Sequence, residues 1–397
     1  MIKSVRIKNY KTCNDVNIIL KEPLMALVGK NAVGKTNTLK GIHYASNCCL
    51  TNIGEEEKLC LKKGFSAEFE LKFERKRTIQ HFVYKYQVYG KGELYIKDTL
   101  WAVKNKKKKL LFKKTAKNIL TLCFEKNKDE KISVPSEFTG LRYLSKIDLS
   151  DKKPSYFVKN LAEHANASSL ISSDLLKVNH HGNQEQSKII IAFKNNFEDW
   201  LEKRSCRNSD ELFTFQHYDF YQSKPEDFSE YKEILKLLGL VQDVKVAEFK
   251  TPADDETHSD ALIYIAFVIN EKKLQFEFLS DGTKRMIRLL FRFFYEKTSL
   301  MLIEEPENSV HWGLLATFLS VLDQYADDKK ILFSTHSEQV LNQLKPEQLI
   351  YVDNIEGNTE AKYLTGRSLK KARNFLADVG SLGEYAISGG LEEDIDG

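Results

Sequence analysis

A glycine-containing loop between an apolar run and a helix-forming segment constrains the fold of this 397-residue chain most strongly. The run Leu24–Val28 is short and continuously apolar, as expected of a strand that is buried on both faces. The loop Gly29–Thr36 reads GKNAVGKT, matches the pattern GxxxxGK(S/T), and is followed by helix-forming residues up to Ala45. Glycines let backbone N–H groups surround phosphate oxygens, and a helix N-terminus adds partial positive charge. The sequence therefore predicts a phosphate-binding strand–loop–helix unit; the alternative is a chance glycine turn.

The side chains of this loop have distinct expected roles. Lys35 is expected to neutralise the β- and γ-phosphates of a nucleotide, and Thr36 to ligate Mg²⁺. Four other positions complete the predicted nucleotide contacts: Gly29, Asn31, Gly34 and Asn37.

A second apolar run, Leu300–Ile303, ends in the adjacent carboxylates Glu304 and Glu305, within the sequence EEPE. Consecutive residues of a strand point to opposite sides, so the two carboxylates need not share a role. We expect Glu304 to hold Mg²⁺ through its water shell. Glu305 is expected to polarise the attacking water as a general base. The alternative is that EEPE begins the next helix as a solvated acidic cap.

Two further segments follow a fixed order along the chain. The sequence LSDG, with Ser280 and Gly282, precedes a predicted helix, and Ser280 could simply cap that helix. Ser280 lies 24 residues before Glu304, and Glu304 lies 32 residues before His336 at the end of another apolar run. A histidine at a strand end is usually a surface residue, but this order favours a contact between His336 and the γ-phosphate.

The predicted elements have the order of an α/β fold with a parallel sheet. Strands at Leu300–Glu304 and Ile331–Thr335 alternate with helices, which are expected at 284–295, 311–325 and 337–344. Residues 65–125 are strand-rich and predict a β-meander folded against two short strands at 3–9 and 14–20. Helical spacing in residues 155–240, including 157–171 and 188–204, predicts a helical insertion. Strands are expected again at 261–270 and 274–280.

We expect four segments. Residues 1–150 form an N-terminal lobe with the loop and a β-subdomain, and residues 151–235 form the helical insertion. Residues 236–365 form a C-terminal lobe with LSDG, EEPE and His336, and residues 366–397 form a tail.

Taken together, the phosphate loop, LSDG, EEPE and the THS sequence at His336 resemble the ABC-type ATPase head, most closely its RecF/SMC/OLD-like branch. The opening IKSVRIKNYKT and the longer GKNAVGKTNTLKGI resemble the first strand and extended Walker A of that branch, and EEPENSVH resembles its Walker B and D-loop. The resemblance covers about residues 1–45 and 235–355. It implies an α/β, ABC-type P-loop ATPase head with a β-meander subdomain and a helical insertion, which hydrolyses ATP with Mg²⁺.

The resemblance also implies a homodimer or higher homo-oligomer. Two ATP molecules would lie between the heads, so Ser280 and Gly282 would act in trans. The chain departs from the pattern where Glu304 replaces the usual Walker B aspartate and where Trp312 stands at a position that is often proline. The Q-loop glutamine is unassigned, with Gln80 and Gln87 as candidates.

The 242 residues between Thr36 and Leu279 lack the sustained heptads of long coiled-coil arms. Only 61 residues follow His336, so a TOPRIM-like nuclease is expected as a separate effector protein. The chain resembles the stand-alone ATPase subunits of phage-defence systems of the PARIS, AbiL and Septu types, which implies an oligomeric scaffold that holds and releases the effector. The alternative is a RecF-like DNA-repair ATPase with DNA-stimulated hydrolysis.

Three further segments have open interpretations. Lys104–Lys117 contains eight lysines and is either a DNA-backbone or acidic-partner patch, or a hairpin edge protected by lysine. The basic segment Arg367–Arg373 is expected to be a packed accessory helix, with a DNA contact as the alternative. The tail Gly380–Gly397 is either disordered or a partner-docking segment.

The overall charge excludes a uniformly basic nucleic-acid coat. Lysine and arginine total 60 against 56 acids, a formal charge of +4. No apolar run reaches 18 residues, so no membrane helix is expected, and the protein is predicted to be cytoplasmic. Six cysteines without a CxxC pair predict ordinary reduced thiols.

Overall fold

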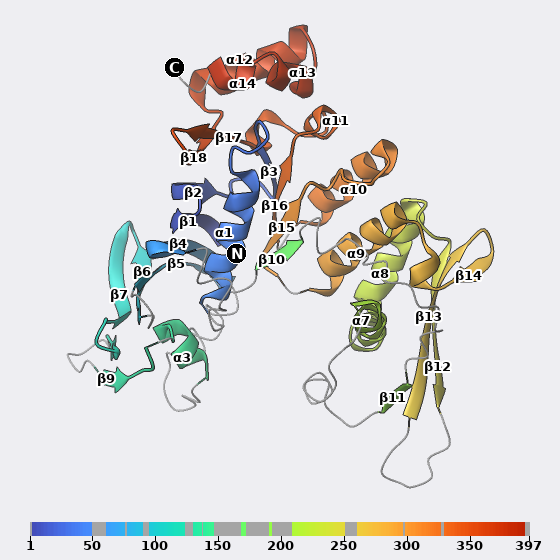
Figure 1. Ribbon diagram of the computed structural model, residues 1–397, viewed down its shortest axis with the longest axis horizontal. Helices are drawn as coiled ribbons and strands as arrows, with labels where there is room; N and C mark the ends of the chain where they lie inside the picture. Colours follow the sequence, from blue (N-terminus) through green and yellow to red (C-terminus); the bar gives the residue numbers. More distant parts are fainter. Residues whose placement is uncertain are drawn as a thin grey trace. The chain divides into compact units, whose positions relative to one another are not determined.

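The structure is a computed structural model that divides into two compact units (Figure 1). Unit 1 comprises Met1–Ser173, Thr298–Asn308 and Leu319–Gly397, and unit 2 comprises Asp174–Lys297 and Ser309–Phe318. The four segments expected from the sequence have other boundaries than these two units and stay a prediction. The structure describes residues 2–49, 61–75, 78–89, 95–123, 130–136, 138–146, 168–171, 190–192, 209–250, 260–296, 298–326 and 329–393.

A six-stranded sheet in unit 1 has the order β10-β15-β16-β3-β17-β18, and all neighbours are parallel except β17 and β18. The strands β3, β15 and β16 are buried along their whole length, as their continuous apolar runs predicted. Because these three strands are parallel neighbours, the residues that follow their carboxyl ends meet at one edge. The strand bounds are β3 (Leu24–Val28), β10 (Ser168–Ile171), β15 (Leu300–Glu304), β16 (Lys330–Thr335), β17 (Leu349–Ile355) and β18 (Asn358–Tyr363).

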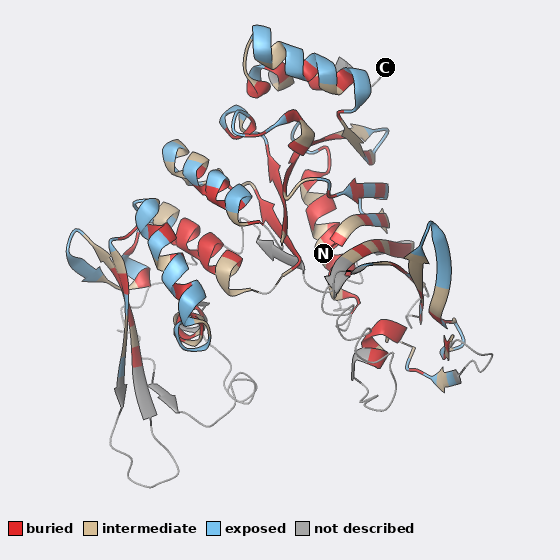
Figure 2. Cartoon of the chain, turned by 180° about the vertical axis from the view of Figure 1, so that it is seen from behind, coloured by how far each residue is buried: buried red, intermediate tan, exposed pale blue. Residues whose placement is uncertain are grey.

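The predicted β-meander is present as an eight-stranded antiparallel sheet of order β2-β1-β4-β5-β6-β7-β8-β9. Its inner face and the six-stranded sheet share one apolar core with the phosphate-loop helix α1 (Lys35–Asn47), and Figure 2 shows much of α1 as buried. The strands are β1 (Ile2–Tyr10), β2 (Cys13–Ile19), β4 (Leu61–Arg75), β5 (Thr78–Tyr89), β6 (Tyr95–Lys104), β7 (Lys107–Lys114), β8 (Ile119–Leu122) and β9 (Glu130–Ser133).

The lysine-rich segment is a hairpin between β6 and β7 that turns at Asn105 and Lys106, both in the left-handed conformation. Along Phe112–Lys114, β7 is paired on both sides, with β6 and with β8, so this part of the segment is not a sheet edge. Lys114 is fully buried, and its Nζ donates to the carbonyls of Ile96, Ser136 and Phe138 at 2.6–3.1 Å. Lys114 therefore belongs to the core and not to any surface patch.

Buried Asp98 on β6 holds the short helix α3 (Gly140–Lys146) against the meander. Its carboxyl accepts hydrogen bonds from the backbone N–H groups of Gly140 and Leu141 and from the Tyr84 hydroxyl, at 2.9–3.3 Å. Burial is the main cause that raises the pKa of Asp98 to about 6.

Within its described residues, unit 2 contains the helices α7, α8 and α9, the start of α10 (Trp312–Tyr325), and a sheet in which β13 lies between β11 and β12. The helices α7 and α8 confirm a helical insertion over residues 209–237. Their core is aromatic: the buried ring of His217 stacks on Phe291 with centroids 4.0 Å apart, and burial lowers the pKa of His217 to about 3. The elements are α7 (Ser209–Ser223), α8 (Pro225–Leu237), α9 (Asp281–Tyr295), β11 (Ile190–Ala192), β12 (Asp243–Lys250), β13 (Asp260–Ile269) and β14 (Lys272–Leu274).

Three local predictions are wrong. Residues 168–171 form β10, which pairs with β15 at the edge of the parallel sheet, instead of extending a helix. Residues 190–192 form β11, because an isoleucine run favours a strand when a partner such as β13 is available. The expected strand at 274–280 is instead the end of β14 followed by the 3₁₀ turn η1 (Phe276–Phe278). The other parts of the segments 157–171 and 188–204 lie outside the described residues.

The C-terminal segment is folded up to residue 393, so plain disorder of the tail is wrong for this part. It consists of α12 (Gly366–Asp378), α13 (Leu382–Ile387) and α14 (Gly390–Glu393). Leu382, Tyr385 and Leu391 are buried, and the Tyr385 ring lies 5.2 Å from that of Phe375 on α12. The apolar residues of the tail therefore pack within the chain. No helix in the described parts of the chain is long and apolar enough to span a membrane.

Candidate functional site

The loop Gly29–Gly34 follows β3 and leads directly into α1, as the motif predicted. Three of its residues have positive φ angles: Gly29 at 154°, Ala32 at 64° and Gly34 at 111°. Gly34 is the N-cap of α1, and no side chain caps the helix there. The first backbone N–H groups of a helix have no partner within the helix, so they are available to an anion.

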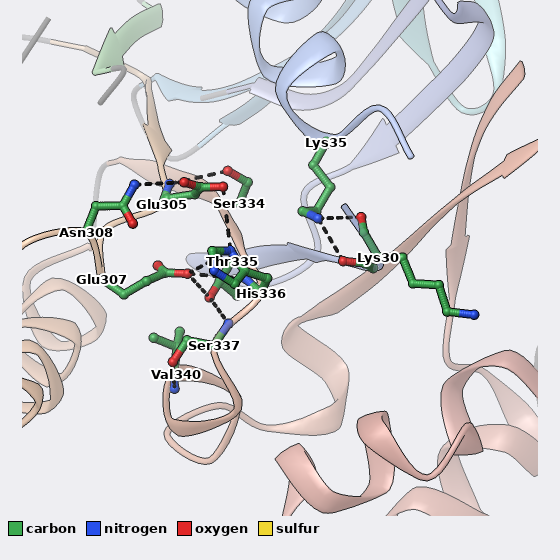
Figure 3. A network of polar contacts seen from close by, with 11 residues as sticks. Lys30, Lys35, Glu305, Glu307, Asn308, Ser334, Thr335, His336, Ser337 and Val340 are labelled. Carbon is green, nitrogen blue, oxygen red and sulfur yellow. Dashed lines mark hydrogen bonds and ion pairs between the residues drawn. The ribbon is translucent and has the colours of Figure 1, made fainter. Parts of the chain in front are cut away.

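Lys35 is the first residue of α1, and its side chain folds back to the loop. Its side chain is 7% exposed, and its Nζ donates to the carbonyls of Gly29 at 2.7 Å and Lys30 at 2.8 Å (Figure 3). Burial lowers the pKa of Lys35, whereas the carboxylates of Glu305 and Glu307 act in the opposite direction. The strand register pairs Val28 of β3 with Thr335 of β16, and Ser334 of β16 with Glu304 of β15, so the loop and the carboxylates follow neighbouring strand ends.

A second set of contacts supports the loop from the β17–β18 hairpin. A Cβ added to Gly29 would lie 2.1 Å from the Val352 carbonyl oxygen, and one added to Gly34 would lie 2.0 Å from Thr359 Oγ1. Thr359 Oγ1 lies 2.8 Å from Thr12 Oγ1 and 3.2 Å from the Val33 carbonyl. Asn37 Nδ2, on the first turn of α1, donates to the same Thr12 hydroxyl at 2.9 Å. The hairpin therefore fixes the path of the loop.

We expect Thr359→Val to weaken ATP binding about fivefold, because the substitution keeps the shape of the side chain but removes a hydrogen bond worth roughly 1 kcal/mol. Isothermal titration with ATP measures the effect. Thr359→Ser retains the hydroxyl and should bind like the unmodified protein. Equal ATP affinity for the valine and serine variants would show that the hydroxyl does not support the loop.

Glu304 and Glu305 have different surroundings at the end of β15. Glu304 is the last strand residue and is 7% exposed. Glu305 has a φ angle of +46°, and its N–H donates to the Ser334 carbonyl at 3.1 Å. Asn308 Nδ2 donates to Glu305 Oε2 at 2.7 Å. Glu305 thus begins a turn outside the strand, whereas Glu304 ends the strand. This difference is compatible with the expectation that the two carboxylates have different roles.

His336 lies beside two carboxylates after β16. Its Nδ1 is 3.6 Å from Glu305 Oε1 and 3.7 Å from Glu307 Oε1 (Figure 3). Glu307 Oε1 also accepts hydrogen bonds from Thr335 Oγ1 at 2.7 Å and from the His336 N–H at 3.2 Å. Glu307 therefore ties the EEPE turn to the end of β16.

Three residues of this arrangement were missed by the sequence reasoning. Glu307 and Asn308 lie two and three residues after Glu305, the predicted base. This closeness in sequence could have pointed to them. Thr359 lies 23 residues beyond His336 in a segment without a recognisable pattern, so only the fold reveals it.

The LSDG segment lies in unit 2 at the start of the 15-residue helix α9. Ser280 is the N-cap, as its sequence position suggested, and its Oγ accepts from the Thr283 N–H at 3.2 Å. A Cβ on Gly282 would lie 2.6 Å from the Ser309 carbonyl oxygen, so this position requires glycine. Ser280 thus caps α9 by accepting from the Thr283 N–H, and Gly282 lies within the first turn of this helix.

The two Q-loop candidates lie within β5 of the antiparallel sheet. Gln80 pairs with Phe73 and Gln87 with Ser66 on β4. Neither lies in a turn at the carboxyl ends of the parallel strands, so this geometry does not support either assignment.

Comparisons with known proteins agree with this arrangement. A family model described as "AAA domain, putative AbiEii toxin, Type IV TA system" matches residues 24–342, which include the phosphate loop, LSDG, EEPE and His336. No curated protein sequence matches the chain.

Among solved structures, the chain is similar to a crystal structure of the SmcHead bound to the C-winged helix domain of ScpA. The identity is 12%, the TM-score is 0.55, and the match covers 94% of this chain and 99% of that chain. An SMC head domain from Thermotoga maritima matches at 12% identity and TM-score 0.44, covering 92% of this chain and 99% of that chain. An Smc head domain with an extended coiled coil, bound to the C-terminal domain of ScpA derived from Pyrococcus furiosus, matches at 13% identity and TM-score 0.45. The match covers 95% of this chain and 99% of that chain. The first likeness confirms the predicted fold class.

Proposed function

This chain belongs to the AAA domain family described as putative AbiEii toxin, Type IV TA system, and we propose that it binds and hydrolyses ATP as one half of a head dimer. One observation carries the proposal. The buried lysine of a glycine loop at a helix N-terminus follows β3, and the neighbouring parallel strands β16 and β15 lead into the histidine and the carboxylates at the same edge of the sheet. A structural lysine would not need this set of groups around it.

The loop supplies the phosphate contacts. Lys35 Nζ already donates to two carbonyls, and it would exchange these for oxygens of the β- and γ-phosphates. The backbone N–H groups of the loop and of Thr36 and Asn37 would add further donors at the start of α1. Gly29, Asn31 and Gly34 would bring the backbone near the phosphates.

Glu305 is the proposed general base. Asn308 and Ser334 hold its side chain and backbone in one orientation, so its carboxylate can accept a proton from the attacking water. His336 is the proposed γ-phosphate contact. Glu307 would hold the backbone beside that histidine and so act as a positioning residue.

The donor set fits Mg²⁺. The Thr36 hydroxyl and the Glu304 carboxylate are hard oxygen donors at the end of the parallel sheet, and Mg²⁺ prefers a few such ligands together with waters and substrate phosphates. The ion would neutralise the charge of the phosphate oxygens.

Dimerisation would complete the site. Ser280 and the backbone at Gly282 present the N-terminus of α9, which suits a phosphate group, and we propose that they contact the ATP bound by the partner subunit. Two ATP molecules would thus be buried between two heads. The SmcHead crystal structure contains a bound domain of ScpA, and this supports the idea that a head of this fold can also hold a second protein.

We further propose that the ATP-bound oligomer is a scaffold in antiviral defence that holds and then releases a separate effector, such as a TOPRIM-like nuclease. The family description, which names a toxin of a Type IV TA system, supports this role. The folded helices α12 to α14 offer a surface for docking the effector.

The proposal is tested by measuring ATP hydrolysis together with mass by light scattering, with and without duplex DNA. Slow turnover indifferent to DNA, with an ATP-dependent doubling of mass, is the expected result. Strong stimulation by duplex DNA would instead favour a RecF-like repair ATPase. Co-expression with the product of an adjacent gene then tests the scaffold, since a stable ATP-dependent complex is expected.

A further inference from the structure

The outward face of the eight-stranded sheet has two halves of different charge. Side chains alternate along each strand, so the residues between the buried positions point away from the core. On β1, β2, β4 and β5 the outward basic side chains lie beside carboxylates, on the neighbouring strand or, for Lys72 and Glu70, on the same strand β4. These pairs are Arg6–Asp15 and Lys8–Asp15 at 2.6 Å, His81–Glu70 at 2.8 Å, Lys72–Glu70 at 3.3 Å and Lys85–Glu68 at 3.5 Å.

The other half carries cations alone. The register places Lys97 on β6, Lys108 and Lys113 on β7 and Lys131 on β9 on the outward face, and all four are exposed. Within the described part of these strands, no outward residue is a carboxylate, since Asp98 is buried on the inner face. Figure 2 shows β7 as largely exposed. We call these four residues the lysine face.

The hairpin tip extends this positive charge. Lys104, Lys106 and Lys107 are exposed around the two-residue turn next to the lysine face. With a total charge of only +4, the chain concentrates its excess of cations in this region. A partner that covers it would be a polyanion.

An aromatic and apolar strip lies among the lysines. Trp101 is half-buried on the outward face of β6, between Val83 on β5 and Leu110 on β7 in the strand register. Lys108 Nζ lies 5.6 Å from the centroid of the Trp101 ring. Lysines bind phosphates and exposed aromatic rings stack with unpaired bases, whereas a duplex keeps its base faces covered.

From this combination, we propose that the lysine face and Trp101 form a docking surface for single-stranded nucleic acid. The proposal goes beyond ATP hydrolysis and uses no residue of the ATP site. The phosphates would pair with the lysine face, and one base would stack on Trp101. Lys114, which the sequence grouped with the other lysines, takes no part because it is buried.

The test is fluorescence anisotropy of the full chain with a labelled 20-nucleotide poly-dT, across a salt series. The triple variant Lys97→Glu, Lys108→Glu and Lys113→Glu should weaken binding at least about tenfold. It should also reduce the magnitude of the salt slope by about 2, since each phosphate contact contributes about 0.7 for a single strand. A matched control, Lys245→Glu with Lys272→Glu and Lys273→Glu, changes three exposed lysines of unit 2 and should bind as before.

Trp101→Ala distinguishes stacking from charge attraction. Loss of one stacked base should weaken poly-dT binding about 5- to 150-fold without changing the salt slope, while Trp101→Phe should retain most of the affinity. Equal affinity of the two lysine triples overturns the proposal. A second result would also overturn it: a 20-base-pair duplex or polyphosphate binds as tightly as poly-dT, and Trp101→Ala leaves poly-dT binding unchanged. Basal ATP hydrolysis should be unchanged in every variant. A failure of the nucleic-acid proposal can therefore be distinguished from a failure of the ATPase assignment.

Discussion

Lys35→Ala is expected to abolish ATP binding and to reduce kcat/KM for hydrolysis at least about 100-fold. The substitution removes the only side-chain cation of the loop that faces its centre, and charge-stabilising donors of this kind contribute 10²-fold or more. Isothermal titration with ATP and a phosphate-release assay measure the two effects.

Lys30→Ala is the matched control for this change. Lys30 lies in the same loop, but its exposed side chain points away from Lys35 (Figure 3). Lys35 Nζ donates to the backbone carbonyl of Lys30, which the substitution keeps. It should bind ATP nearly as well as the unmodified protein. Thermal unfolding of both variants separates loss of binding from loss of fold. A folded Lys35→Ala protein with normal ATP affinity would contradict the phosphate-loop assignment.

Glu305→Gln is expected to slow hydrolysis about 10²- to 10⁴-fold while ATP remains bound, because a general base contributes a factor of this size. Glutamine has the same shape and can still accept the hydrogen bond from Asn308, but it cannot take a proton. With ATP not consumed, the dimer should persist, and light scattering should show about twice the monomer mass.

Glu338→Gln, an exposed carboxylate of α11 (Glu338–Leu341), makes the same chemical change outside the proposed site. It should hydrolyse ATP at the normal rate and dimerise only transiently. If Glu305→Gln hydrolyses ATP at the unmodified rate, the general-base assignment fails. A trapped monomer with bound ATP would instead contradict the head dimer.

The buried strands were the most predictable part of the fold. The strands Leu24–Val28 and Leu300–Glu304 have the expected bounds, because a continuous apolar run between polar turns has few other solutions. By contrast, β10 has the sequence SSLI, which carries no strand signal of its own and is ordered by pairing with β15. Pairing with β15 therefore determines that these residues form a strand, because their local strand propensity is too weak to do so.

The candidate site shows the same division. Lys35, Glu305 and His336 could be identified from motif spacing, since parallel strands bring their ends to one edge. The contacts of Thr359 with Thr12 and Val33 join segments separated by more than 300 residues, and no local pattern encodes them.

The position of β3 has a consequence for synthesis on the ribosome. Both neighbours of β3, the strands β16 and β17, lie about 300 residues later in the chain, and Gly34 packs against Thr359 in the next strand. At about 5–20 residues per second, that separation corresponds to roughly 15–60 s of translation. The phosphate loop therefore leaves the ribosome well before the strands that surround it in the native fold. Chains that end before β17 should be unable to bind ATP, so nucleotide binding reports that β17 and β18 have been synthesised and have paired.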